Sequence, residues 1–159
     1  AVEVESPFDR LADVAAGWAD GLVGAWERAG CPCERRLVDA ALDAIAELAP
    51  VQGPQVLIHQ DLHPGNVLAS TRLPWLAIDP KPVVGELAFA VAPVVRAVPL
   101  GHDPISVSGR LHWLSAELGV DRERARGWTI AQAMAWSFGS PWEEHAHQTV
   151  RWLLEDAGR

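Results

Sequence analysis

Basic residues and cysteine are scarce in this 159-residue sequence. Thirteen Lys and Arg stand against 21 Asp and Glu, so the net charge is −8. Because nucleic-acid binding requires clustered Lys and Arg, this balance argues against a nucleic-acid partner and favours a cationic ligand. The two cysteines, Cys31 and Cys33, are separated by one residue. This spacing suits neither an ordinary disulfide nor the C-x-x-C motifs of zinc and redox sites.

Long apolar runs are also absent from the sequence. No stretch of about 18 apolar residues could span a membrane, and no charged segment followed by an apolar one marks a secretion signal. We therefore expect a soluble, cytoplasmic protein that does not act at a membrane. Hydrophobic residues nevertheless make up 49% of the chain, which is enough to build the core of one domain at this length.

Helical patterns occupy both ends of the chain. Ser6 followed by Pro7 is typical of a helix start, and Gly30 is typical of its end. Further segments have the apolar spacing that predicts helices, at about residues 34–49, 105–118, 121–138 and 141–156. The last of them opens with a capping-box sequence, Ser140-Pro141-Trp142-Glu143.

Short β-type runs lie between these helical regions. Residues 55–58, 66–69 and 75–78 predict strands, with a polar turn between the second and the third. From Val84 onward the pattern is helical again, and Pro93 predicts a kink or an early helix end. The predicted fold class is therefore α+β, mostly α-helical, with a small β-hairpin.

The segment from His59 to Asn66, with the sequence His-Gln-Asp-Leu-His-Pro-Gly-Asn, carries the chemistry. Phosphoryl transfer needs a carboxylate beside the acceptor hydroxyl and hard oxygen ligands for magnesium. Asp61 suits the first task. Asn66 and Asp79, which follows the last predicted strand, suit the second. The pattern is typical of a kinase that uses ATP and Mg²⁺ as cofactors.

Two other interpretations of this segment stay open. His59, Asp61 and His63 alternate, so on an extended strand they would form a ligand set for zinc in a metal hydrolase. Alternatively, the segment is a purely structural turn. His145 and His147 add no metal site, because helical residues two apart diverge by about 200°.

The segment 59–66, with residues 75–81 (Trp-Leu-Ala-Ile-Asp-Pro-Lys) and 84–86 (Val-Gly-Glu), resembles the aminoglycoside phosphotransferases. Among them it is most similar to the streptomycin and hydroxyurea kinase branch. The resemblance implies a protein-kinase-like C-terminal lobe, with Asp61 as catalytic base and with Asn66 and Asp79 as magnesium ligands. It also implies transfer of the ATP γ-phosphate to a hydroxyl of a cationic, streptomycin-like antibiotic, and hence antibiotic resistance.

Acidic residues of the helical tail are candidates for contacts with that cationic substrate. The resemblance implies that this lobe offers acidic groups, and Asp103, Glu143 and Glu144 are the candidates. The alternative for each is a solvated surface charge. Two features depart from the family pattern: Gln60 stands where such kinases often carry Gly, and residues 86–90 lack the Asp-Pro expected after Gly85.

A glycine-rich nucleotide loop is missing from the sequence. There is no G-x-G-x-x-G, and the only lysine, Lys81, follows the catalytic segment, whereas a nucleotide-lobe lysine precedes it. We therefore expect residues 1–159 to form a single domain, the C-terminal lobe of such a kinase. Its absent N-terminal nucleotide lobe would be a partner. The alternative is a truncated kinase-like protein that binds a ligand without transferring phosphate.

Overall fold

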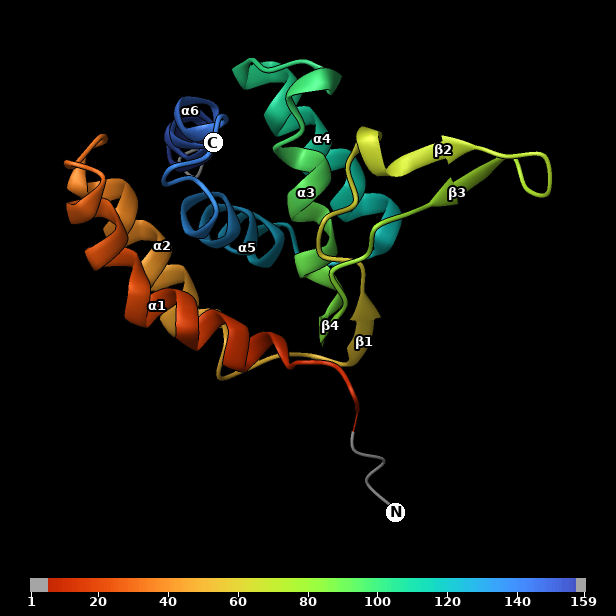
Figure 1. The fold of residues 1–159 in the computed structure, drawn as a ribbon, viewed down its shortest axis with the longest axis horizontal. Coiled ribbons are helices and arrows are strands. Elements are labelled where there is room, and N and C mark those ends of the chain that lie inside the picture. Colours follow the sequence, from red (N-terminus) through yellow and green to blue (C-terminus); the bar gives the residue numbers. More distant parts are fainter. Residues whose placement is uncertain (1–5, 157–159) are drawn as a thin grey trace.

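The computed structural model describes residues 6–156, which are mostly helical and carry two antiparallel pairs of strands (Figure 1). This confirms the predicted α+β, mostly α-helical class. The helices are α1 (Leu11–Arg28), α2 (Arg35–Leu48), α3 (Ala92–Val95), α4 (Pro104–Leu118), α5 (Arg122–Ala135) and α6 (Glu143–Asp156). The strands are β1 (Gln55–Ile58), β2 (Val67–Ala69), β3 (Trp75–Ala77) and β4 (Val83–Glu86), and the 3-10 segments are η1 (Pro64–Asn66), η2 (Leu87–Val91) and η3 (Val98–Leu100).

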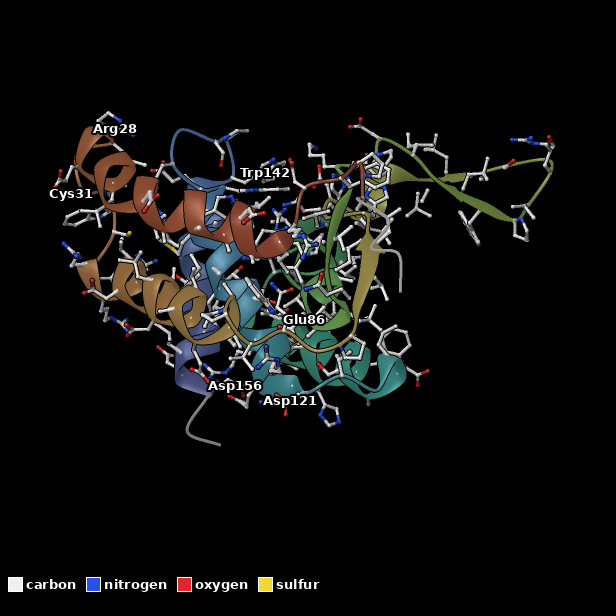
Figure 2. All side chains as sticks on the ribbon, turned by 90° about the horizontal axis from the view of Figure 1, so that it is seen from below. Arg28, Cys31, Glu86, Asp121, Trp142 and Asp156 are labelled. Atoms are coloured by element: carbon white, nitrogen blue, oxygen red, sulfur yellow. The ribbon has the colours of Figure 1, made fainter. Side chains whose placement is uncertain are left out.

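Helix α5 lies at the centre of the helical body and packs against α2, α3, α4 and α6. Its Trp128 is fully buried and meets the ring of Phe89 edge-on, with the ring centroids 5.5 Å apart. The indole N–H of Trp128 donates to the buried carboxylate of Glu86, which also accepts hydrogen bonds from Arg124 at 2.7 and 2.8 Å. Glu86 lies among the helices in Figure 2. This network ties β4 to α5.

Helix α1 begins later than the sequence predicted. We expected Ser6 to cap the helix, yet the helix starts at Leu11. Backbone pairing to β4 explains the difference, because the Val84 N–H donates to the Asp9 carbonyl at 2.9 Å and keeps the chain extended before the helix. Tertiary pairing thus overrides a local capping signal. The predicted end is confirmed, since Gly30 follows the helix with a φ of 81°.

The strands form two separate pairs, β1 with β4 and β2 with β3. The second pair is the predicted hairpin, with Val67 opposite Ala77 and Ala69 opposite Trp75. It extends away from the helices in both views (Figure 1, Figure 2). Among the described residues, no helix is both long enough and apolar enough to cross a membrane.

Residues 84–97 do not form the predicted helix. The start of this segment belongs to strand β4, which pairs with the whole of β1, from Gln55 opposite Glu86 to Ile58 opposite Val83. The chain then passes through η2 into the short helix α3. Pro93 lies in the first turn of α3, so it neither kinks nor ends a longer helix. A first-turn position has no intrahelical acceptor for a backbone N–H, so proline is tolerated there.

Helices α5 and α6 are shorter than predicted, because a turn occupies the residues between Ala135 and Glu143. The Ser140 hydroxyl accepts the Trp142 N–H at 3.2 Å, and the Glu143 carboxylate accepts the Gly139 N–H at 2.8 Å. Both side chains of the predicted capping box therefore bond backbone N–H groups. A capping box would pair Ser140 with the Glu143 N–H and Glu143 with the Ser140 N–H, so each observed donor lies one residue earlier in the chain than expected.

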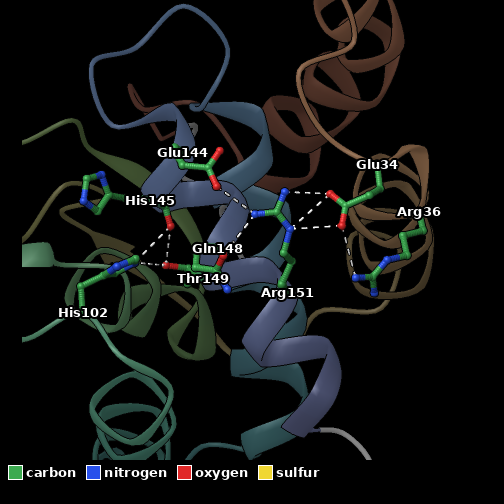
Figure 3. Close-up of polar contacts among 8 residues, drawn as sticks. All are labelled: Glu34, Arg36, His102, Glu144, His145, Gln148, Thr149 and Arg151. Carbon is green, nitrogen blue, oxygen red and sulfur yellow. Dashed lines mark hydrogen bonds and ion pairs between the residues drawn. The ribbon is translucent and has the colours of Figure 1, made fainter.

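Arg151 of α6 connects this helix to the start of α2 (Figure 3). Its guanidinium donates to both carboxylate oxygens of Glu34 at 2.8–3.2 Å and to Glu144 at 3.0 Å. The hydrogen bonds from Arg151 lower the pKa of Glu34 to about 2 from an ordinary value of 4.5. The same bonds raise the pKa of Arg151.

Acid should weaken this connection. Because the folded pKa of Glu34 lies below its unfolded value, its contribution to stability is complete above the ordinary pKa of 4.5 and is lost as the pH falls toward 2. Solvent screens this exposed pair, so the effect is small. We expect Glu34→Gln to reduce the fall in denaturation midpoint between about pH 5 and pH 3. Glu117→Gln, at an exposed position on α4, is the matched control. Equal acid sensitivity of Glu34→Gln and the wild type would contradict this expectation.

Candidate active site

The segment from His59 to Asn66 forms the loop between β1 and β2. The His59 ring holds this loop against the end of β3: Nδ1 accepts the Asp61 N–H at 3.4 Å, and Nε2–H donates to the Ile78 carbonyl at 2.9 Å. The Lys81 N–H donates to the His59 carbonyl at 3.0 Å. One ring nitrogen of His59 therefore bonds within the loop, and the other joins the loop to the residue that follows β3.

Asp61 presents a largely buried carboxylate surrounded by basic groups. Its side chain is 13% exposed, and Oδ2 accepts a hydrogen bond from the ammonium group of Lys81. Oδ1 faces Arg96 Nη2 at 3.7 Å and His63 Nε2 at 3.8 Å. Both distances are too long for hydrogen bonds. One carboxylate oxygen is thus held by Lys81, while the other retains lone pairs for a further donor.

Gln132 of α5 links Arg96 to the backbone of the loop. Its buried side chain donates from Nε2 to the Gln60 carbonyl at 2.9 Å and accepts Arg96 Nε–H at 3.1 Å. The guanidinium also lies 5.1 Å from the centroid of the Trp136 ring. Burial lowers the pKa of Arg96 and the charge of Asp61 opposes that shift, and an arginine stays protonated in either case. Helix α5 therefore positions both Arg96 and the loop.

Gln60 occupies a backbone conformation that favours glycine. Its φ is 65°, in the left-handed region that side-chain-bearing residues seldom adopt. The glycine that the family resemblance led us to expect at this position would adopt the same conformation without strain. The hydrogen bond from Gln132 to the Gln60 carbonyl stabilises the unusual conformation here.

Asn66 and Asp79 lie next to each other at the open ends of the hairpin. The Ile78 N–H donates to the Asn66 carbonyl at 2.9 Å, which brings the following residue, Asp79, beside Asn66. Asn66 Nδ2 donates to the Asp61 carbonyl at 2.9 Å. Among the described residues, no hydrogen bond occupies Asn66 Oδ1 or the exposed carboxylate of Asp79. Both side chains carry oxygen atoms of the hard type that Mg²⁺ prefers, and their role as magnesium ligands stays a prediction.

The structure does not form the zinc ligand set of the metal-hydrolase interpretation. That set required an extended strand, whereas Gln60 has a left-handed backbone. Both nitrogens of His59 have partners in the protein, and His63 Nδ1 accepts the Gly65 N–H at 3.1 Å. Within residues 6–156, no group of three His, Cys, Asp or Glu side chains could hold a metal ion.

The acidic residues predicted to contact a cationic substrate each have a partner within the protein. Asp103 caps α4, and hydrogen bonds from the side chain and backbone of Ser106 lower its pKa. Glu143 accepts a backbone N–H from the preceding turn, and Glu144 pairs with Arg151 (Figure 3). Their contact with a substrate stays a prediction.

A cavity of about 230 Å³ opens beside Asp61. His63 and Arg96, which face Asp61 Oδ1, both line it, together with Trp142 and His145 from the start of α6. A larger hollow of about 380 Å³ between α4 and α6 is lined by none of the predicted catalytic or metal-binding residues. Asp61 itself is not among the residues that line the 230 Å³ cavity; His63 and Arg96 connect the cavity to its carboxylate.

Three residues of this site had no assigned role in the sequence interpretation. The sequence indicated only that Lys81 follows the catalytic segment, whereas a nucleotide-lobe lysine precedes it. Its position two residues after Asp79 could have indicated that it lies close to the site. No local pattern marks Arg96 or Gln132, because both come from helical segments that reach the loop only through packing.

Comparison with known proteins identifies the chain's family. The model of the aminoglycoside/hydroxyurea antibiotic resistance kinases matches residues 2–140. The chain therefore belongs to this family of kinases, as the sequence predicted.

Individual relatives carry the two activities in the family's description. A hydroxyurea phosphotransferase of Kitasatospora aureofaciens is 44% identical over 78% of this chain and 35% of its own length. Two streptomycin 6-kinases, of Streptomyces glaucescens and Streptomyces griseus, are 38% and 36% identical over 92% of this chain and 45% of their own. The chain thus spans less than half the length of these relatives. No solved structure matches it significantly.

Proposed function

We propose that this chain carries the catalytic base and metal ligands of an ATP-dependent phosphotransferase that acts on a hydroxyl of a small antibiotic and so causes resistance. The helical body and its loop would be a protein-kinase-like C-terminal lobe. The observation that carries the proposal is the state of Asp61: Lys81 holds Oδ2, while Oδ1 faces two residues of the adjacent cavity. The names of the relatives supply streptomycin and hydroxyurea as acceptors to test.

Asp61 would orient the acceptor hydroxyl and take its proton at Oδ1. The hydroxyl oxygen forms a bond to the γ-phosphorus of ATP as the bond from that phosphorus to the β–γ bridging oxygen breaks, and ADP leaves. Lys81 keeps the other carboxylate oxygen in place. Fixing the carboxylate in this way matters because phosphoryl transfer depends mainly on positioning and on electrostatic stabilisation.

Asn66 Oδ1 and the Asp79 carboxylate would hold the magnesium ion. The bound ion supplies positive charge that neutralises the phosphate oxygens. The hydrogen bond from Asn66 Nδ2 to the Asp61 carbonyl orients the amide, so that Oδ1 is the atom left for the metal. The same bond couples the position of this ligand to the loop that bears the base.

We also propose that a nucleotide-binding lobe lies outside these 159 residues. The sequence contains no glycine-rich nucleotide loop, and its only lysine, Lys81, is paired with Asp61. The relatives are more than twice as long as the part that matches. The additional lobe would cover the nucleotide, while this chain contributes the base, the metal ligands and the acceptor cavity.

Transfer of radiolabelled γ-phosphate from ATP tests the proposal. The protein, including its nucleotide lobe, is incubated with Mg²⁺ and either streptomycin or hydroxyurea. We expect labelled product from at least one acceptor, and its loss when EDTA removes the metal. A protein that binds Mg·ATP yet labels neither acceptor would contradict the proposal, and acceptor binding without transfer would favour the non-catalytic alternative.

Replacing Gln132 by Leu should impair positioning more than substrate binding. The Gln60 carbonyl and Arg96 Nε would lose their buried partner, so we expect the free energy of unfolding to fall by about 1–3 kcal/mol. We also expect kcat to fall by about tenfold or more, with little change in KM. Denaturant unfolding and initial rates measure the two effects.

The Gln132→Glu variant is the matched comparison for this experiment. It retains an acceptor for Arg96 but cannot donate to the Gln60 carbonyl, so it separates the two contacts. A wild-type kcat in a measurably destabilised Gln132→Leu variant would show that the link does not serve catalysis.

A further inference from the structure

The carboxylate of Asp61 faces more positive charge than it can neutralise. Lys81 bonds Oδ2, and Arg96 Nη2 lies 3.7 Å from Oδ1. These two cations outnumber the single charge of Asp61 by one, and His63, at 3.8 Å, would add to the surplus when its ring is protonated. Asp79 carries the other carboxylate of the proposed site, where a magnesium ion would offset its charge. A chain with a net charge of −8 thus concentrates positive charge around its proposed base.

Arg96 keeps its two terminal nitrogens available for a ligand. Gln132 accepts the Nε–H at 3.1 Å, and within residues 6–156 neither terminal nitrogen makes a hydrogen bond. The distance of 3.7 Å to Asp61 Oδ1 is too long for one. Arg96 also lines the cavity next to the loop. A guanidinium with both terminal nitrogens free has the fork geometry that binds two oxygens of one phosphoryl group.

Trp136 holds both cations at the end of α5. The centroid of its ring lies 5.1 Å from Cζ of Arg96 and 5.8 Å from Nζ of Lys81, within the range of cation–π attraction. The Trp136 N–H donates to the Gln132 carbonyl at 3.1 Å. The two residues are one helical turn apart, so they reach the guanidinium from the same face of α5. The ring can position these cations without neutralising them, because it carries no net charge.

We infer that Arg96 binds the phosphoryl group as it passes to the acceptor, and that Trp136 is a positioning residue that holds Arg96 and Lys81 beside Asp61. This inference rests on the proposed function and adds two residues to it. As the acceptor oxygen bonds to the γ-phosphorus and the bond to the bridging oxygen of ADP breaks, the guanidinium would donate to two non-bridging oxygens. Asp61 takes the hydroxyl proton, and ADP leaves.

Two substitutions test Arg96 in the protein that includes its nucleotide lobe. We expect Arg96→Ala to lower kcat by about 10²–10³-fold, with KM for ATP and for the acceptor changed by less than about threefold. Arg96→Lys keeps the charge and lacks the fork, so it should fold and lose at least about tenfold in kcat. Initial rates are measured with whichever of streptomycin and hydroxyurea the wild type phosphorylates.

Chemical rescue separates a catalytic role of Arg96 from a structural one. Guanidinium ion at millimolar concentration should restore part of the rate of Arg96→Ala. Urea has a similar planar shape and no charge, so it should restore none. Arg35→Ala is the matched control, because Arg35 also lies over a tryptophan, Trp26 at 5.6 Å, and does not line the cavity. Its kcat should equal that of the wild type.

The role of Trp136 is tested with a matched pair of tryptophans. Trp136→Leu removes the cation–π contacts and should lower kcat about tenfold, with little change in KM. Trp136→Phe retains an aromatic face and should keep most of the rate. Trp26→Leu removes the ring beneath Arg35, so it should reduce stability and leave kcat unchanged.

The possible results separate the inference from the proposed function. A wild-type kcat in Arg96→Lys or in a folded Arg96→Ala variant would overturn the inference alone, as would equal rescue by guanidinium and urea. A higher KM for the acceptor at unchanged kcat would also overturn it, since Arg96 would then bind the acceptor and not the phosphoryl group. An effect of Trp136→Leu no larger than that of Trp26→Leu would refute the role of Trp136. A wild type that phosphorylates neither compound would refute both proposals.

Discussion

An Asp61→Asn variant is expected to lose phosphate transfer almost completely, with kcat lower by about 10³-fold and a folded structure retained. The amide cannot accept the hydroxyl proton, yet it has nearly the shape of the carboxylate and can still accept a hydrogen bond from Lys81. Because the Lys81 side chain is 51% exposed, solvent can compensate for the lost charge. Initial rates with Mg·ATP and circular dichroism measure the two outcomes.

Asp20→Asn is the matched control for this substitution. Asp20 lies exposed on α1, and the same change in net charge there should leave kcat at the wild-type value. Asp61→Asn should also leave the affinity for Mg·ATP nearly unchanged, since Asn66 and Asp79 are the proposed ligands. A folded Asp61→Asn variant with more than about a tenth of the wild-type kcat would refute the role of Asp61 as base.

Trp128→Ala is expected to lower the free energy of unfolding by about 3–5 kcal/mol. The side chain is fully buried, so the substitution creates a cavity at the centre of α5. It also removes the edge-on contact with Phe89 and one of the donors to the Glu86 carboxylate. Since domains of this size are stable by only about 5–15 kcal/mol, much of that stability would be lost. Urea denaturation followed by fluorescence and circular dichroism measures the change.

Two further variants show which feature of Trp128 matters. Trp113→Ala, at a position that is 60% exposed, should change the free energy of unfolding by less than about 0.5 kcal/mol. Trp128→Phe retains an aromatic ring but removes the N–H donor to Glu86, so its effect should be intermediate. A Trp128→Ala variant as stable as Trp113→Ala would show that α5 is not the centre of the core.

The elements that sequence predicted well are those with local determinants. Helix α2 shows this, because Leu37, Ala41, Ile45 and Leu48 recur with helical spacing and all four are buried. The hairpin formed where β-type runs flank a polar turn. The loop from His59 to Asn66 could likewise be predicted, since its Pro-Gly turn and its polar residues are consecutive.

The elements that sequence predicted wrongly depend on distant partners. Strand β4 forms because it pairs with β1. In the same strand, the Val84 N–H donates to the Asp9 carbonyl, and this bond delays the start of helix α1. Nothing near Val84 in the sequence reveals those hydrogen bonds. A local helical pattern was therefore overruled by long-range backbone pairing.

The sequence by itself supplied the residues that we propose for catalysis and for metal binding. Asp61, Asn66 and Asp79 follow from residue type and spacing, because phosphoryl transfer needs a carboxylate and hard oxygen ligands in a fixed order along the chain. The same reasoning led to the family, which the comparison confirmed.

Only the tertiary structure decided which charged groups surround Asp61, Asn66 and Asp79. Lys81 reaches Asp61 because His59 joins the loop to the end of β3, and Arg96 reaches it because Gln132 of α5 holds the guanidinium. The charge of −8 suggested a cationic ligand, yet, of the residues that the structure describes, Arg96 and two histidines but no carboxylate line the cavity next to the Asp61 loop. Net charge is a sum over the whole surface, whereas a ligand responds to the few groups that packing brings within reach of it.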